Sequence, residues 1–480
     1  MTLSSIKFVI FLAVVSLAYF LLPRKLRKYF LLISNYIFYM LWQPAFGFLL
    51  LAGTVVTYLC ARGFEAKAIQ RSKLWIVLGE LYIFGVLFIY KYLEFFCSVT
   101  LGLVGVELSI NSLVLPIGIS FYTFSASAYL FDVYRGKISA ERNFIDFAAF
   151  LSFFPSILSG PINRAQSILP QIRESRDFDY LRFKKGLLRF AVGAAKKLVL
   201  ADTLAIYINA VYSDVSAYSG AGLALAAIMY SLQIYFDFAG YTDMALGAAK
   251  ILGYELEENF KAPYLVRNVK EFWKKWHISL TSWFRDYLYF PLGGSRVSKA
   301  RTCFNVMVVF AVSGLWHGAA MNFVVWGLLN GLYQVIGQLL SPARHKLHKA
   351  LHINEDSRLL ALVQCAFTFV LITIAWIFFR AASLGEAVYI IHEIVLTAVS
   401  GVNGTGILSL LSIKQIALII FCIALFTVQD IICIRGKKLP DLSEHSFRYW
   451  LVLCLIAVFI CIFGVYGDGF DPQAFVYFKF

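Results

Sequence analysis

The sequence is poor in charged residues. Only 15% of its 480 residues are Asp, Glu, Lys or Arg, whereas 60% are hydrophobic and the mean hydropathy is +0.73. Soluble globular chains carry about 25% charged residues and roughly 45–50% apolar ones. A water-soluble domain has no way to bury so much apolar surface. The composition therefore excludes soluble, disordered, disulfide-scaffold and nucleic-acid-binding proteins, and it predicts a polytopic membrane protein.

The sequence also lacks the short motifs of several enzyme classes. It contains no GxxxxGK[ST], HExxH or GxSxG segment, and no CxxC pair or Cys/His spacing suited to a metal. ATP-driven transport, zinc proteolysis and ordinary serine hydrolysis therefore lose their usual support. We expect no metal and no bound cofactor, and we interpret the eight cysteines as small, reduced core residues.

Basic residues outnumber acidic ones by 43 to 28, and they lie in short loops between apolar runs. This is the positive-inside pattern, which reports orientation in a bilayer. With these loops in the cytoplasm, the chain has about twelve spans and both termini outside. We expect one all-α, multi-pass domain over residues 1–480, in the plasma or inner membrane, with its core motifs in 110–340.

Two apolar runs do not fit simple spans. Residues 144–158 are too few to cross comfortably, lie between two basic loops and carry Pro155. They predict a re-entrant or interfacial segment. Residues 303–340 are too many for one span and have basic loops on both sides, so they predict a hairpin.

The least hydrophobic part of the chain contains His277. At 100° per residue, His277 falls on one helical stripe with its aromatic and leucine neighbours, whereas Arg285 and Asp286 lie off that stripe. This spacing predicts a helix that ends at Pro291 and the following glycine pair. One interpretation makes His277 a satisfied core histidine, and the other makes it a site residue. The stripe consists of Trp273, Trp276, His277, Leu280, Phe284 and Leu288.

His317 lies inside the 303–340 hairpin, at membrane depth. An ionisable group in a span is costly and is a functional candidate by default. The alternative is helix packing around a neutral histidine, because Gly314 and Gly318 allow another backbone or an extended ligand to come close. Of the seven histidines, only His277 and His317 are flanked by Trp-rich, small-residue apolar sequence. A neutral imidazole suits proton abstraction from a hydroxyl.

Two further features have open interpretations. Asp237 stands at the end of a predicted span, where it either forms a structural ion pair or supports the site, for example by pairing with His277. The aromatic tail 467–480, expected outside the membrane, is either an interfacial belt or a functional element centred on Tyr477.

Three segments carry a resemblance. WKKWHISLTSWFRDYLYFPLGGSR (273–296), SGLWHGAAMNFVVWG (313–327) and SGPINR (159–164) resemble membrane-bound O-acyltransferases of the bacterial alginate O-acetyltransferase branch. Relatives that export D-alanyl groups to teichoic acids, or acetyl groups to peptidoglycan or cellulose, are similar too.

The resemblance implies that His317 is catalytic and that His277 is the second histidine of the site. It also implies helices around a thin partition pierced by a tunnel, and it implies that Tyr477 is an acyl relay. The remaining members of the expected site are supporting residues. They are Trp276, Trp316, Arg285, Asp286, Asn322 and Asp237.

We expect acetyl-CoA, or a carrier-protein thioester, to dock at the basic loops 164–189 and 261–301. The acyl group would pass outward to a polysaccharide or cell-wall polymer through an extracellular, SGNH-type acetyltransferase partner. The alternatives are export of D-alanyl or another acyl group from a carrier protein, and a transporter or flippase without covalent chemistry.

Overall fold

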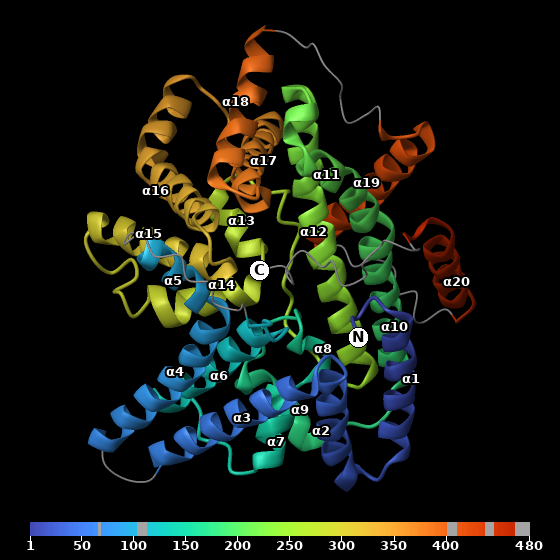
Figure 1. Ribbon diagram of the computed structural model, residues 1–480. Coiled ribbons are helices and arrows are strands. Elements are labelled where there is room, and N and C mark those ends of the chain that lie inside the picture. The colour runs from blue at the N-terminus through green and yellow to red at the C-terminus, as the bar shows by residue number, and fades with distance from the viewer. Residues whose placement is uncertain (66–68, 103–112, 401–409, 437–445, 466–480) are drawn as a thin grey trace.

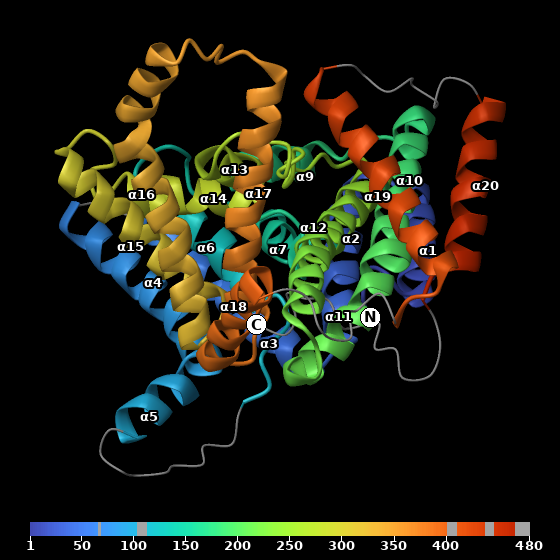
Figure 2. The same ribbon diagram turned by 90° about the horizontal axis from the view of Figure 1, so that it is seen from above.

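The computed structural model describes the chain except for residues 66–68, 103–112, 401–409, 437–445 and 466–480, and its described part contains helices and no strand. This confirms the expected all-α class. Figure 1 shows the arrangement, and Figure 2 shows it from above.

The helices that precede the long central one are α1 (Ile6–Leu21), α2 (Arg24–Met40), α3 (Pro44–Glu65), α4 (Ile69–Lys91), α5 (Leu93–Gly102), α6 (Ile119–Tyr134), α7 (Phe144–Leu151), α8 (Phe154–Ile157), α9 (Ala165–Glu174), α10 (Tyr180–Ala195), the π-helix η1 (Lys196–Ala201), α11 (Asp202–Ser213) and the 3₁₀ turn η2 (Val215–Ala217). Those from the central helix onward are α12 (Gly220–Ile251), α13 (Val269–Lys275), α14 (Ile278–Phe284), the π-helix η3 (Arg285–Tyr289), α15 (Lys299–His317), α16 (Met321–Ala350), α17 (Arg358–Arg380), α18 (Leu384–Ser400), α19 (Ile413–Ile434) and α20 (Ser446–Phe463).

Seven described helices are long and apolar enough to cross a membrane, fewer than the twelve or so spans expected. They are α3, α4, α12, α16, α17, α19 and α20. The difference arises because several apolar runs form shorter helices inside the bundle. For example, α6 has 16 residues, and nearly all of them are buried.

Helix α12 runs through the middle of the molecule, with α10 and α11 beside it (Figures 1 and 2). Helices α10 and α12 approach closely at paired glycines. A Cβ at Gly193 would lie 2.6 Å from the Gly240 carbonyl oxygen, and one at Gly247 would lie 2.7 Å from the Gly186 carbonyl oxygen. Contacts this short leave no room for a side chain, so these two helices pack backbone to backbone.

The two unusual apolar runs both form helices, and the second forms the predicted hairpin. Residues 144–158 form the short helices α7 and α8, which are largely buried. The hairpin at 303–340 is α15 followed by α16. Helices α13 and α14 lie between this hairpin and α12 in both views, which brings the segments 273–296 and 313–327 together (Figures 1 and 2).

Candidate active site

The helix expected through His277 is broken at that residue, which corrects the prediction of a continuous stripe. Helix α13 ends at Lys275, and α14 begins at Ile278. Between them His277 has a φ of +43°, in the left-handed region, where a non-glycine residue costs about 1–2 kcal/mol. As expected, helical structure ends before Pro291, through η3.

A buried asparagine holds this break in place. The backbone N–H of Ile278 donates to the Asn259 carbonyl at 3.0 Å, and both the N–H and the hydroxyl of Ser279 donate to Asn259 Oδ1, at 3.1 and 2.7 Å. The Ile162 N–H in turn donates to Ser279 Oγ at 3.1 Å. Two of the three segments that carry the resemblance, 159–164 and 273–296, are therefore joined through Ser279.

Because the helix is interrupted at His277, the side chain of this residue lies in an aromatic cluster. Its side chain is fully buried, and the Phe238 ring lies edge-on at 4.7 Å between centroids. The Phe121 and Trp316 rings lie at 6.4 and 6.3 Å. Trp316 is thus a shared neighbour, because its ring also contacts His317 at 4.7 Å.

His317 is the last residue of α15, and only 3% of it is exposed. The rings of Trp326 and Phe379 surround it at 4.8 and 5.3 Å, so α15, α16 and α17 all contribute to its environment. The rings of both His277 and His317 contact Trp316, at 6.3 and 4.7 Å between centroids. The fold therefore brings together two histidines that are far apart in the sequence.

Glycines set the distance between α15 and α16. A Cβ at Gly314 would lie 2.3 Å from the Phe323 carbonyl oxygen, and one at Gly327 would lie 2.2 Å from the Phe310 carbonyl oxygen. The close approach expected at Gly314 is therefore to another backbone. It fixes where α15 ends, and hence where His317 stands.

Gly327→Val should destabilise the protein by about 1–3 kcal/mol, because the new side chain must push α15 away from α16. The readout is the thermal unfolding midpoint in detergent. Gly337→Val is the matched control, since a Cβ at Gly337 on the same helix meets nothing within 4 Å. Equal midpoints for the two variants would contradict this account of the hairpin.

A hollow leads to His317. It encloses about 470 Å³, counting the part open to solvent, and its walls come from the end of α4, the segment before α6, the first turn of α6, α8 and the end of α15. It is lined by Lys91, Leu115, Pro116, Ile117, Gly118, Ile119, Ser120, Phe121, Leu158, Trp316 and His317.

Lys91 is a site residue that the sequence analysis missed. Its Nζ donates to the Trp316 carbonyl at 2.5 Å and lies 5.5 Å from the Trp316 ring centroid. Carbonyls in the last turn of a helix lack helical partners, and a cation there also complements the helix dipole. Lys91 therefore fixes the peptide unit that precedes His317. The available signal was a lysine at the end of an apolar run, the kind of residue that marks function in a membrane.

The other expected supporting residues occupy different places. Trp276 is buried beneath the break, stacked on Phe272 at 5.3 Å. Asn322 is buried too, and its Nδ2 donates to the Ala381 carbonyl at 2.9 Å, which ties α16 to the end of α17. Neither residue lines the hollow that reaches His317.

The charged candidates lie in ion pairs. Asp286 accepts from Arg285 Nε at 2.9 Å and from Arg164 at 3.4 Å, which links η3 to the start of α9. Asp237 forms a buried ion pair with Lys197 at 2.7 Å, as the structural interpretation expected. Tyr477 and the whole tail 467–480 lie outside the described residues. No group of three or more His, Cys, Asp or Glu suited to a metal occurs within the described part of the chain.

Comparisons with known proteins identify the family of this chain. A family model described as the membrane-bound O-acyltransferase family matches residues 135–384, more than half of the chain. The probable alginate O-acetylase of Pseudomonas syringae pv. tomato is 37% identical over 378 residues, covering 77% of this chain and 70% of the relative.

Two relatives of other kinds also match. The peptidoglycan O-acetyltransferase of Helicobacter pylori is 31% identical over 430 residues, covering 83% of this chain and 79% of the relative. The teichoic acid D-alanyltransferase of Bacillus subtilis is 27% identical over 263 residues, covering 53% of this chain and 66% of the relative. The chain therefore belongs to the membrane-bound O-acyltransferase family and is a multi-pass membrane acyltransferase.

Proposed function

We propose that this acyltransferase takes an acetyl group from a cytoplasmic thioester and delivers it across the membrane for O-acetylation of an extracellular polysaccharide or cell-wall polymer. The observation that carries the proposal is the pair His277 and His317, buried around one indole, with a hollow that reaches His317. The alginate and peptidoglycan acetyltransferases among the relatives support an acetyl group and a polymer acceptor. Membership of an acyltransferase family decides against a transporter without covalent chemistry.

The donor site is proposed at the basic segment 261–301, and acetyl-CoA is the donor that fits it best. Six exposed lysines and arginines there make no side-chain hydrogen bond or ion pair to another described residue. Positive charge of this kind favours a polyanionic donor. By contrast, Arg164, Arg173 and Arg189 of the second expected loop already pair with acidic residues. The six residues are Lys261, Lys270, Lys274, Arg296, Lys299 and Arg301.

His317 is proposed as the general base. Its imidazole takes the proton of the acceptor hydroxyl as the oxygen attacks the thioester carbonyl, so that a C–O bond forms. The C–S bond then breaks, and the departing thiolate receives the proton. His277 is proposed to assist His317 through their shared neighbour Trp316. Lys91 holds the end of α15 through its hydrogen bond to the Trp316 carbonyl. Since the thioester is already activated, the main task of the protein is to align two substrates from different compartments.

The acceptor side of the proposal involves Tyr477. In this scheme both termini lie outside the cell membrane, and the Tyr477 hydroxyl accepts the acetyl group. An exported SGNH-type acetyltransferase then passes it to the polysaccharide. The aromatic tail sequence and the sidedness of the basic loops support this route.

The experiment uses membrane vesicles with their cytoplasmic face outward. We expect labelled acetyl-CoA added outside to produce acetylated Tyr477, detected by mass spectrometry of the carboxyl-terminal peptide when the exported partner is absent. Tyr477→Phe should remove the label.

Three other outcomes of this experiment would each contradict a different part of the proposal. A label elsewhere in the chain, unaffected by Tyr477→Phe, would contradict the relay but keep acyl transfer. Transfer only from a carrier-protein thioester would replace acetyl-CoA as donor and would favour D-alanyl or other acyl export. Transfer to an acceptor on the cytoplasmic side would contradict export.

A further inference from the structure

A large apolar groove lies between α1 and α10, on the side of the molecule away from the α15–α16 hairpin. These two helices stand next to each other in Figures 1 and 2. The groove encloses about 1250 Å³, counting the part open to its surroundings. Eleven of its twelve lining residues are apolar. They are Val9, Leu12, Ala13, Ser16, Leu17, Phe20, Leu21, Phe178, Phe183, Leu187, Phe190 and Ile251.

The groove has a closed base and an open side. At the base, Phe8 stacks on Phe190 with 6.1 Å between ring centroids, which joins α1 to α10. On the open side, Leu17 and Leu21 are 65% and 76% exposed. In a membrane protein this open side faces the hydrocarbon of the bilayer, so the groove suits an occupant that is apolar along its length.

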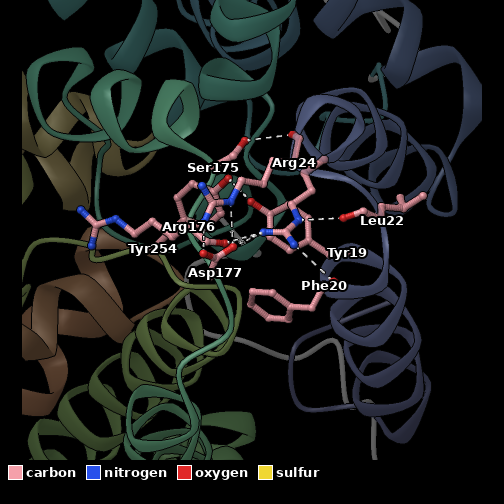
Figure 3. Close-up of polar contacts among 9 residues, drawn as sticks. Tyr19, Phe20, Leu22, Arg24, Ser175, Arg176, Asp177 and Tyr254 are labelled. Carbon is pink, nitrogen blue, oxygen red and sulfur yellow. Dashed lines mark hydrogen bonds and ion pairs between the residues drawn. The ribbon is translucent and has the colours of Figure 1, made fainter.

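Aromatic rings and charged residues lie at one end of the groove, and Figure 3 shows the polar contacts there around Arg24 and Asp177. Phe20 contacts Phe178 at 5.3 Å, and Phe178 contacts Phe183 at 5.8 Å. Directly beyond them Arg24 pairs with Asp177. The apolar lining of the groove therefore ends at Phe20 and Leu21, and the charged cap begins at Arg24.

Buried Arg27 fixes the geometry of this cap. It donates to the carbonyls of Phe20, Leu22 and Arg176, at 3.3, 3.0 and 2.9 Å, and so joins the end of α1 to the loop before α10. The hydrogen bond from Arg24 lowers the pKa of the Asp177 carboxyl, which keeps that carboxyl charged at neutral pH. These hydrogen bonds and ion pairs therefore hold the cap in a defined conformation.

The charges around the cap favour an anion. Besides the buried Lys184, the two segments that meet at the cap, 24–27 and 174–185, carry six basic residues and three acidic ones, and Asp177 already pairs with Arg24 and Arg27. The side chains of Lys25 and Arg182 form no ion pair within 4.0 Å in the part of the chain that the structure describes, although the Arg182 backbone N–H donates to Asp179 Oδ1 at 2.9 Å. The basic residues are Arg24, Lys25, Arg27, Arg176, Arg182 and Lys185, and the acidic ones are Glu174, Asp177 and Asp179.

We propose that this groove binds a phospholipid with an anionic head group. Its acyl chains lie between α1 and α10, and its head group lies at the cap, beside Lys25 and Arg182. The cap closes one end of the groove, so a transmembrane helix of a partner, which would have to continue past the cap, does not fit. A phospholipid fits because its apolar chains end in a charged head group at this point. A bound lipid would hold α1 against the α10–α12 core, away from the histidines.

The test uses the full-length protein purified in detergent, with native mass spectrometry and thermal unfolding as readouts. We expect about one phospholipid to be retained per chain. After delipidation, phosphatidylglycerol should raise the unfolding midpoint more than phosphatidylcholine with the same chains, because a ligand that binds only the folded state stabilises it.

Two pairs of variants make the test specific. Ala13→Trp fills the groove and should abolish lipid retention, whereas Val14→Trp, exposed on the same helix but outside the lining, should not. Lys25→Gln should lower the preference for phosphatidylglycerol about tenfold. Lys7→Gln makes the same charge change at the other end of α1 and should leave that preference unchanged.

Three results would overturn the proposal. These are equal retention in Ala13→Trp and Val14→Trp, equal stabilisation by the two lipids, or cross-linking of residues 466–480 to Leu17→Cys, which would make a segment of this chain the occupant.

Discussion

Replacing His317 with alanine is expected to lower acetylation of the exported polymer by at least about 100-fold in cells. Removal of a general base typically costs 10²- to 10⁴-fold in rate, and His317 is the histidine that lines the hollow. The measurement is the ester-linked acetate of the polymer, at matched amounts of protein in the membrane.

The matched control is His345→Ala. His345 is exposed, and its Nδ1 lies 2.9 Å from Glu355 Oε1, so its loss should leave acetylation near the wild-type level. His317→Gln, which keeps most of the side-chain volume, guards against loss through misfolding. His277→Ala should also lower acetylation, and the double variant should lose less than the product of the two effects, since the residues act as a unit. Wild-type acetylation with His317→Ala would remove this histidine from the mechanism.

Lys197→Met is expected to destabilise the protein by about 3–5 kcal/mol, the usual cost of removing one partner from a buried ion pair. Lys197 Nζ lies 2.7 Å from both Asp202 and Asp237, and all three side chains are at most 4% exposed. Without the ammonium, two carboxylates remain buried close together between η1, α11 and α12. The measurement is the thermal unfolding midpoint in detergent.

Lys250→Met serves as the control, because its pair with Glu255 is partly exposed, and such pairs contribute little. The triple variant Lys197→Met, Asp202→Asn, Asp237→Asn should recover much of the stability, since no buried charge is left without its counter-ion. An unfolding midpoint for Lys197→Met equal to that of Lys250→Met would show that these charges do not stabilise the core.

Much of the architecture could be predicted from local sequence. Residues 144–158 were too short to span, and they form two short helices; residues 303–340 were too long for one span, and they form the α15–α16 hairpin. Seven described helices are long and apolar enough to cross a membrane, against about twelve spans expected, because hydropathy cannot separate a helix buried by protein, such as α6, from one that faces lipid.

The site was only partly predictable, for a different reason. His277 and His317 stood out because polar residues are rare in apolar sequence. The break at His277 depends on Asn259, and the end of α15 depends on Lys91, and both contacts join segments distant in the chain. No periodicity within one segment reveals such a partner. A continuous helical stripe was therefore the wrong prediction at His277.

The most direct test uses purified protein in lipid vesicles, supplied with labelled acetyl thioester and a hydroxyl acceptor in a single-turnover measurement. We predict that the wild-type chain transfers the label, and that His317→Ala, with an unchanged unfolding midpoint, transfers it at least about 100-fold more slowly. Equal rates for the two proteins would contradict the claim that acyl transfer takes place at His317.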